Sequence, residues 1–271
     1  MAAPVLVTGG TGTLGRLVVP RLRAAGCEVR VLSRRRRALG EGIEVVTGDL
    51  TTGEGIDAAV AGAGVIVHCA GSRTGDKVKA GHLVRAAATA GVRHLVFISV
   101  VGADRVPQTG RLDRAMFGYF GSKLAAERVV AGSGLPWTTL RATQFHDSVY
   151  LVVSQLARLP VAPVPAGIRF QPVDTGEVAD RLVELVLGPP SGLVPDLAGP
   201  GSDELAGLLR GYLRTVHRRR PILPVPVPGR AARALRAGAN LAPDRAVGRR
   251  TWEEFLEAKL PTPSHRGAGP A

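Results

Sequence analysis

Cysteine and aromatic residues are scarce in this chain of 271 residues. It contains two cysteines, Cys27 and Cys69, and aromatic residues make up 4% of it. Both cysteines lie in or beside stretches that we interpret as buried strands, so we expect reduced core thiols rather than a disulfide or a metal-binding pair. The few aromatic residues provide little stacking surface for single-stranded nucleic acid, and no DNA-reading motif is present.

Long apolar runs and targeting segments are missing as well. No apolar run reaches the roughly 18 residues that a membrane-spanning helix needs. The N-terminus lacks a charged segment that leads into an apolar stretch and a cleavage site. We therefore expect a cytoplasmic protein that does not contact a membrane. The histidines show no metal-ligand spacing, and the G-x-S-x-G, Walker and zinc motifs are absent, so we predict no metal site and no hydrolase or nucleotide triphosphatase.

Positive charge is abundant, with a formal net charge of +13. Much of it comes from arginine clusters at residues 34–37, 218–220 and 249–250. Arginine accompanies abundant alanine, glycine and proline along the whole chain, which indicates a compositional bias. We therefore expect a small-molecule partner and consider nucleic acid unlikely. An apolar content of 45% excludes global disorder, and the length suits one large domain or a domain with a small lobe. The oligomeric state stays open.

A glycine-rich turn near the N-terminus is the most informative motif. An apolar strand leads into glycines 9, 12 and 15, and helical spacing of apolar residues follows. The first glycine permits a tight turn, the second leaves room for a pyrophosphate, and the third lets the helix lie close to the strand. Main-chain N–H groups at the helix start would bind the phosphates. The turn predicts dinucleotide contacts at Gly9, Thr11, Gly12, Thr13, Leu14 and Gly15.

Strand and helix patterns alternate through the first half of the chain. We predict strands near residues 4–8, 28–33, 43–47, 64–70, 94–100 and 136–141, and helices near 13–25, 54–62, 76–90 and 112–132. This alternation predicts an α/β Rossmann-like fold, a doubly wound parallel sheet with a small C-terminal substrate lobe. Proline clusters interrupt the second half, where we expect helices near 176–187 and 202–216. The predicted division is an NAD(P)-binding core at 1–150, an interleaved substrate lobe at 151–260 and a flexible tail at 261–271.

The residues at the end of the second strand indicate which of the two nicotinamide cofactors is preferred. An acidic residue there would bind a ribose hydroxyl, whereas arginine would pair with a 2′-phosphate. The chain has Ser33 followed by Arg34 and three further arginines. We therefore predict that NADP(H) is preferred, with contacts from Ser33 and Arg34. Binding of NAD(H), or a solvated arginine loop without a ligand, is the alternative.

Two further strand ends are predicted to contact the cofactor. Asp49 and Leu50 follow the third strand, where they would face the adenine. Cys69, Ala70 and Gly71 follow the fourth strand, and small residues there would let the cofactor pass close to the backbone.

A tyrosine and a lysine provide the catalytic candidates. Tyr119 and Lys123 stand four residues apart, on one face of a predicted helix. The ammonium is expected to lower the phenol pKa, so that Tyr119 exchanges a proton with a carbonyl or alcohol while Lys123 holds the nicotinamide ribose. The alternative is a chance spacing, because Gly118 and Gly121 weaken the local helix.

These residues together resemble the short-chain dehydrogenases/reductases, specifically their atypical NmrA-like branch. The resemblance spans roughly residues 4–190 and is carried by residues 8–15, 49–50, 97–99, 119–127, 135–141 and 171–179. It implies NADP(H) binding and assigns a catalytic role to Ser99, although Ser99 precedes Val100-Val101-Gly102 and so stands a residue or two early. It also implies that Thr143, Gln144 and Phe145 lie beside the nicotinamide. His146, in a predicted loop, is either a proton carrier or a hydrogen-bonded structural residue.

The resemblance leads to one predicted function and two alternatives. The prediction is an NADPH-dependent oxidoreductase that transfers hydride to a small carbonyl, quinone or imine acceptor. One alternative is an NADP(H)-binding redox sensor or regulator without turnover. A weaker alternative is a sugar-nucleotide epimerase or dehydratase that retains its cofactor.

Overall fold

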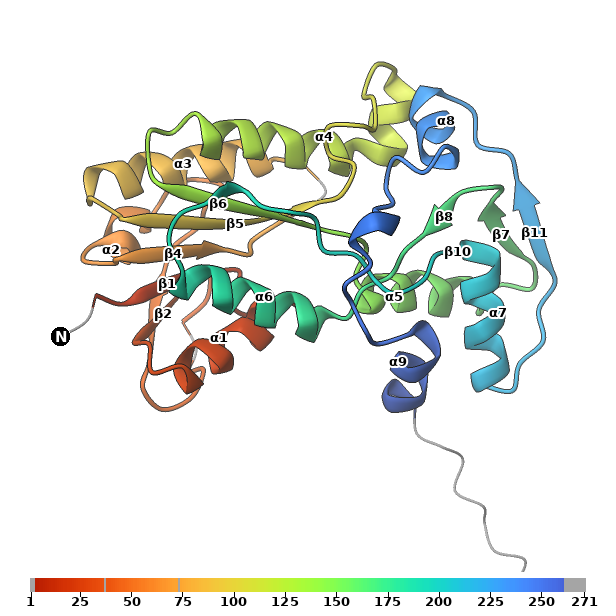
Figure 1. The fold of residues 1–271 in the computed structure, drawn as a ribbon, viewed down its shortest axis with the longest axis horizontal. Coiled ribbons are helices and arrows are strands. Elements are labelled where there is room, and N and C mark those ends of the chain that lie inside the picture. Colours follow the sequence, from red (N-terminus) through yellow and green to blue (C-terminus); the bar gives the residue numbers. More distant parts are fainter. Residues whose placement is uncertain (1–2, 37, 73, 261–271) are drawn as a thin grey trace, which may run out of the picture.

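Near-continuous runs of valine, leucine and isoleucine build the central sheet. In the computed structural model, which describes residues 3–36, 38–72 and 74–260, these runs form most of the strands of a seven-stranded sheet. Figure 1 shows the sheet between its helices. The strands are β1 (Val5–Thr8), β2 (Val29–Ser33), β3 (Ile43–Thr47), β4 (Val65–His68), β5 (His94–Val100), β6 (Trp137–Ala142) and β9 (Gly192–Leu193). Every residue of β1 and β5 is buried, as expected for strands covered on both faces.

The strand order gives the topology of the fold. The sheet runs β3-β2-β1-β4-β5-β6-β9, and every neighbouring pair is parallel. The chain leaves β1 in one direction, toward β2 and β3, and later continues on the other side through β4. A crevice therefore opens at the carboxyl ends of β1 and β4, where open α/β sheets bind ligands. This arrangement confirms the predicted Rossmann-like fold class, with β9 as an additional strand.

Helices cover both faces of the sheet (Figure 1). One face packs against α1 (Gly15–Ala24) and α6 (Thr175–Leu187). The other face is covered by α2 (Ile56–Val60), α3 (Asp76–Thr89) and α4 (Arg111–Ala131). The predicted α4 forms without a break at Gly118 and Gly121. Among the residues that the structure describes, no helix has the length and apolar character needed to cross a membrane.

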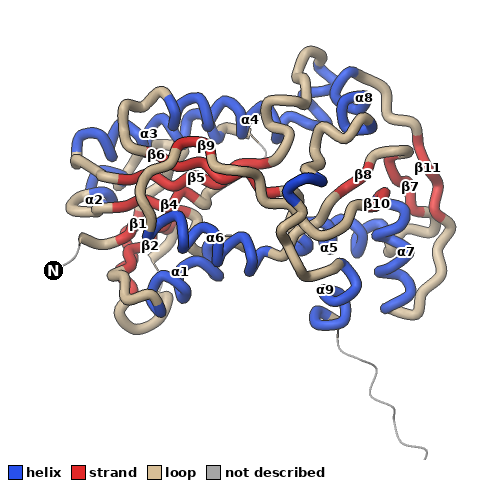
Figure 2. The backbone as a smooth tube through the Cα atoms, in the orientation of Figure 1, coloured by secondary structure: helices blue, strands red, loops and turns tan. Residues whose placement is uncertain are grey.

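The remaining elements gather at one end of the sheet, to the right in Figures 1 and 2, where loops connect short strands and helices. They are α5 (His146–Leu156), β7 (Ala162–Pro165), β8 (Arg169–Phe170), β10 (Asp203–Glu204), α7 (Leu205–Thr215), β11 (Ile222–Val225), α8 (Arg230–Arg236), the 3-10 turn η1 (Pro243–Arg245) and α9 (Trp252–Lys259). They bury apolar clusters of their own, including Leu209, Trp252 and Leu256.

The structure bears on three sequence expectations about the second half of the chain and the arginine run. The predicted boundary at residue 150 falls inside α5, and α6 and β9 return from the second half to the sheet. The loop expected at His146 is wrong, because α5 begins at that residue. The predicted tail at 261–271 and Arg37 of the arginine run lie outside the described residues.

Candidate active site

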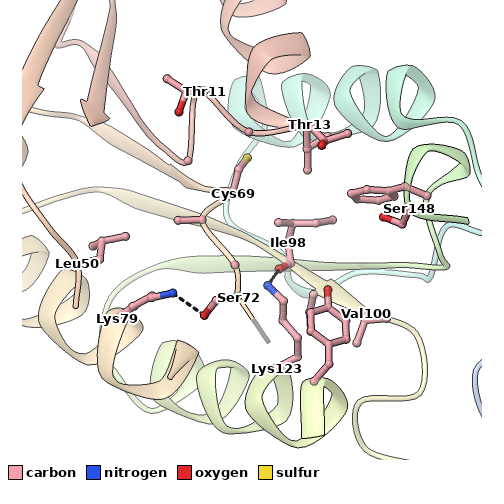
Figure 3. A pocket seen from close by; sticks show the side chains of 18 of the residues that line it. Thr11, Thr13, Leu50, Cys69, Ser72, Lys79, Ile98, Val100, Lys123 and Ser148 are labelled. Atoms are coloured by element: carbon pink, nitrogen blue, oxygen red, sulfur yellow. Dashed lines mark hydrogen bonds between the residues drawn. The ribbon is translucent and has the colours of Figure 1, made fainter. Parts of the chain in front are cut away.

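A cavity of about 620 Å³ opens at the carboxyl ends of the strands. Residues that follow β1 to β6 line it together with side chains of α3, α4 and α5 (Figure 3). It brings together all the site residues predicted from the sequence except Gly15: Gly9, Thr11, Gly12, Thr13, Leu14, Ser33, Arg34, Asp49, Leu50, Cys69, Ala70, Gly71, Ser99, Tyr119, Lys123, Thr143, Gln144 and Phe145. Residues from six strand ends thus converge on one site.

The glycine turn after β1 packs closely against the loop after β4 and against the start of α1. Gly9 has a φ of +70°, a left-handed conformation that glycine adopts without strain, and a Cβ there would lie 2.6 Å from the Ala70 nitrogen. A Cβ on Gly15 would lie 2.2 Å from the Gly9 carbonyl oxygen, so Gly15 holds α1 against the turn rather than lining the cavity. No side chain caps the start of α1. Main-chain N–H groups at this end of the helix dipole fit a phosphate group.

The edge beyond β2 and β3 carries charges of both signs. Arg34 is exposed and lines the cavity, whereas the Ser33 hydroxyl donates to the Arg35 carbonyl oxygen at 2.9 Å. The backbone N–H of Thr51 donates to Asp49 at 2.7 Å and holds the pKa of that carboxyl below its usual range. The positive charges of Arg34 and Lys79 act in the same direction.

Lys123 is a buried ammonium on the cavity wall. Only 3% of the residue is exposed, and Nζ donates to the Ile98 carbonyl oxygen at 3.2 Å (Figure 3). Nζ also lies 3.5 Å from a carboxylate oxygen of Asp76 and 5.0 Å from the centre of the Phe97 ring. Burial lowers the pKa of Lys123, and the Asp76 carboxylate opposes that shift.

Tyr119 stands beside this ammonium, with Lys123 Nζ 5.9 Å from the centre of its ring. The predicted lowering of its pKa is wrong. Burial and the negative charge of Asp76 raise the pKa of Tyr119 to about 12. The residue keeps 39% of its surface exposed, so water screens part of this effect. The sequence argument included neither the burial of Tyr119 nor Asp76, and both raise the pKa.

Ser99 lies within β5, one residue before the strand ends, and it lines the cavity with 4% of its surface exposed. Within the described part of the chain, its hydroxyl has no hydrogen-bond partner. A buried hydroxyl without a partner is rare in proteins and suits one that a ligand would satisfy.

The residues after β6 connect the cavity to the C-terminal half. The side-chain oxygen of Gln144 accepts from the backbone N–H of Gln171 at 3.2 Å. The Thr143 hydroxyl accepts from the backbone N–H of Gly199 at 3.3 Å. These contacts fix the wall where the second half of the chain meets the crevice.

His146 does not face this cavity as a proton carrier. It is fully buried at the start of α5 and stacks on Phe255, with ring centres 5.0 Å apart. Among the described residues neither ring nitrogen finds a hydrogen-bond partner, so the predicted hydrogen-bonded role is also wrong. Burial lowers the pKa of His146 to about 4, which leaves the ring neutral at neutral pH.

Sequence reasoning missed several polar residues at the site. Ser72, Lys79 and Ser148 line the cavity, and Asp76 lies behind Lys123. Ser72, Lys79 and Asp76 follow β4 through a loop and one helical turn, where the sequence carries no motif. Ser148 lies on α5, a helix that the sequence analysis did not predict. One indication of these residues was present in the sequence: they follow strands whose carboxyl ends were already predicted to contact the cofactor.

The comparisons with known proteins agree with this geometry. A family model described as NAD(P)H-binding matches residues 9–157, which is more than half of the chain. A ceramide reductase of Caulobacter vibrioides is 32% identical over 247 residues, covering 83% of this chain and 74% of that protein. A (4-alkanoyl-5-oxo-2,5-dihydrofuran-3-yl)methyl phosphate reductase of Streptomyces griseus is 35% identical over 147 residues, covering 53% of this chain. That match spans 49% of the reductase, about half of its length.

A solved structure shows the same fold over nearly the whole chain. The NADPH-dependent quinone oxidoreductase of Escherichia coli, complexed with NADPH, superimposes with a TM-score of 0.79 at 16% identity. The match covers 94% of this chain and 99% of that structure. The family model, the ceramide reductase and the strand order lead to one assignment. The chain belongs to the NAD(P)H-binding family, in agreement with its resemblance to the atypical short-chain dehydrogenases/reductases.

Proposed function

We propose that this protein is an NADPH-dependent reductase that transfers hydride to a small organic acceptor of the carbonyl, quinone or imine type. One observation carries the proposal: a single cavity joins the glycine turn after β1 to the Tyr119 and Lys123 pair on α4. The turn suits a diphosphate, and the pair suits proton transfer. A cofactor that spans the crevice would place its two ends at these two sites.

The preference for NADPH rests on Arg34. This exposed guanidinium lines the cavity edge after β2, where a 2′-phosphate would lie. Arginine binds phosphate through parallel charge-assisted hydrogen bonds, whereas the unphosphorylated ribose of NADH gives it no such partner. The chain therefore would bind NADPH more tightly than NADH.

The catalytic groups would act around the reduced nicotinamide, which supplies hydride when bound. The Tyr119 phenol is protonated at neutral pH, because its pKa is raised to about 12, and reduction of an acceptor needs that proton. As the phenol gives its proton to the acceptor oxygen or nitrogen, the Lys123 ammonium offsets the charge left on the phenolate. The unpartnered hydroxyl of Ser99 would donate to the acceptor.

The acceptor site would lie where residues 143–145 meet the C-terminal half. Hydrogen bonds from Gln171 and Gly199 hold this wall, and Ser148 of α5 adds a hydroxyl. We therefore assign substrate binding to the lobe within residues 151–260. The quinone oxidoreductase is named for a quinone, which supports an acceptor of that class here.

A matched pair of tyrosine variants tests the reaction. NADPH consumption is measured with a panel of quinones, imines and aldehydes. Tyr119→Phe is expected to lower kcat roughly 10²–10⁴-fold, because the proton donor is lost, with little change in NADPH affinity. Tyr150→Phe is the control, since Tyr150 packs on Tyr212 and Phe255 and does not line the cavity. Equal turnover by both variants would refute the role of Tyr119.

The redox-sensor alternative gives a different result in the same assay. Tight NADPH binding by the wild-type protein with no consumption on any acceptor would support the sensor and exclude the reductase for that panel.

A further inference from the structure

Hydrogen bonds with Ser72 and Ser122 fix Asp76 in place behind the cavity wall. Asp76 is the first residue of α3, and none of its surface is exposed. Its Oδ1 atom accepts from the Ser72 backbone N–H at 2.9 Å and from the Ser72 hydroxyl at 3.0 Å. Its own backbone N–H donates to the Ser122 hydroxyl of α4 at 3.2 Å. The side chain therefore has one defined orientation.

The second carboxylate oxygen of Asp76 faces Lys123. Within the described residues Oδ2 accepts no hydrogen bond, and it lies 3.5 Å from Lys123 Nζ. A Cβ added to Gly71 would lie 2.9 Å from Nζ and 3.7 Å from Oδ2, so glycine keeps the space beside this ion pair free. Because Gly71 lines the cavity, that space belongs to the cavity side of the pair.

A buried ammonium needs a counter-charge. Transfer of a charged group from water into the protein interior costs several kcal/mol unless an opposite charge and hydrogen bonds compensate. The Ile98 carbonyl oxygen and the face of Phe97 contribute dipoles to Lys123, but no net negative charge. Asp76 is the carboxylate that lies next to the Lys123 ammonium.

The other titratable groups around Lys123 do not replace Asp76. Burial raises the pKa of Cys69 to about 12 and lowers that of His68 to about 3, so both are neutral at neutral pH. Tyr119 is also protonated, Lys79 carries a positive charge 3.7 Å from Asp76, and Glu127 is engaged by Arg141 at 2.7 and 2.9 Å. Asp76 thus supplies the nearest negative charge to Lys123, through Oδ2, while Lys79 lies nearest to Oδ1.

We propose that Asp76 is a positioning residue for Lys123, whose buried carboxylate keeps the ammonium charged and aimed at the cavity until the ribose hydroxyls of the cofactor bind it. The inference rests on the proposed cofactor role of Lys123. The 3.5 Å separation is longer than a good charged hydrogen bond, and Nζ has three donors of which Ile98 engages one. Lys123 therefore keeps donor capacity for a ligand.

The first test titrates Lys123 without cofactor. The lysine side-chain carbon signals are followed by NMR, and Lys123→Met assigns the Lys123 resonance. The wild-type ammonium is expected to be protonated at neutral pH, because the Asp76 carboxylate opposes the lowering of its pKa by burial. Asp76→Asn is expected to lower the Lys123 pKa by at least about one unit, a tenfold change in its ionisation constant. Asp113→Asn is the control, because Asp113 is also a buried carboxylate on α4. Its carboxylate accepts a hydrogen bond from the backbone N–H of Ala231 and makes no ion pair with Lys123 among the described residues.

The second test measures NADPH affinity by calorimetry at about pH 6 and about pH 9. Asp76→Asn is expected to weaken binding roughly tenfold more at the higher pH, because loss of the carboxylate lowers the Lys123 pKa and leaves less of the lysine charged there. Asp76→Glu, which keeps the charge, is expected to restore most of the affinity, and Asp113→Asn to show no such pH dependence.

The outcomes separate this inference from the proposed function. A wild-type protein that binds no NADPH refutes the function, whereas the Lys123 titration in the free protein still decides the role of Asp76. An unchanged Lys123 pKa in folded Asp76→Asn overturns the inference. If that variant does not fold, the wild-type titration decides: a Lys123 that is already neutral at about pH 7 overturns the inference, and one that stays charged supports it.

Discussion

Gly15→Ala is the sharpest test of the phosphate-binding turn, because the added methyl group meets only backbone atoms. It would lie 2.2 Å from the Gly9 carbonyl oxygen and 2.6 Å from the Gly10 Cα atom. Real Cβ contacts essentially never fall below 3.0 Å, so the start of α1 and the turn must separate by about 0.8 Å. Overpacking of this kind costs about 1–3 kcal/mol of folding free energy.

The same displacement changes the main-chain N–H groups that would bind the diphosphate. Loss of one hydrogen bond to a charged group costs about 1.5–3 kcal/mol, which corresponds to a roughly 10–150-fold weaker Kd. The diphosphate is common to both coenzymes, so we expect this loss for NADPH and NADH alike.

Calorimetry of both coenzymes and urea unfolding measure the two effects of Gly15→Ala. Gly81→Ala is the matched control, because Gly81 lies within α3 and a Cβ there meets nothing within 4 Å. It is expected to leave both affinities unchanged and to stabilise the protein by about 0.5–1 kcal/mol. Wild-type affinity for both coenzymes in Gly15→Ala would refute the assignment of this turn to phosphate binding.

Two further predictions concern charge. Arg34→Gln is expected to weaken NADPH binding roughly 10–100-fold and to change NADH binding less than about twofold. Arg35→Gln is the control, because Arg35 does not line the cavity, and it should change neither affinity. An unchanged ratio of the two coenzyme affinities in Arg34→Gln would contradict the role of Arg34. The second prediction follows from the pKa values of His146, about 4, and His68, about 3. Between about pH 6.5 and 4 the unfolded chain binds protons that the folded chain does not, so stability falls as pH falls, by about 2 kcal/mol per histidine at pH 5. Urea unfolding at pH 7 and 5 should show about half of this loss removed in His146→Leu, and an unchanged pH dependence would contradict it.

The core of the fold was predictable because local pattern and global arrangement agree there. Apolar runs such as Leu95–Ile98 can be satisfied only by burial on both faces, and the glycine turn fixes the direction of the first βαβ unit. The C-terminal half was less predictable. Its strands β8, β9 and β10 have two residues each, too short for a period-two pattern, and their pairing depends on distant partners.

The limits of the site prediction have a physical cause. Backbone roles such as that of Gly9 depend on local conformation and can be inferred from adjacent residues. The charge state of Tyr119 depends on Asp76, which is 43 positions earlier and reaches the site through the packing of α3 on α4. The i, i+4 rule placed Tyr119 and Lys123 together but contained no information about the third charge. The predicted sign of the pKa shift was wrong because burial of Tyr119 raises its pKa and the Asp76 charge adds to that rise.

The cost of the Asp76–Lys123 pair bears on the choice between reductase and sensor. A buried ion pair is often no more stabilising than apolar residues of similar size, so folding alone does not account for it. Binding of the diphosphate does not require it either, because the glycine turn and Arg34 lie at other parts of the cavity. An ammonium held next to a half-exposed tyrosine has a use where a phenol loses its proton, since the resulting negative charge then forms beside it. A protein that only senses the cofactor would use the pair for the nicotinamide ribose alone, whereas a reductase would use the same ammonium a second time, when the phenol loses its proton.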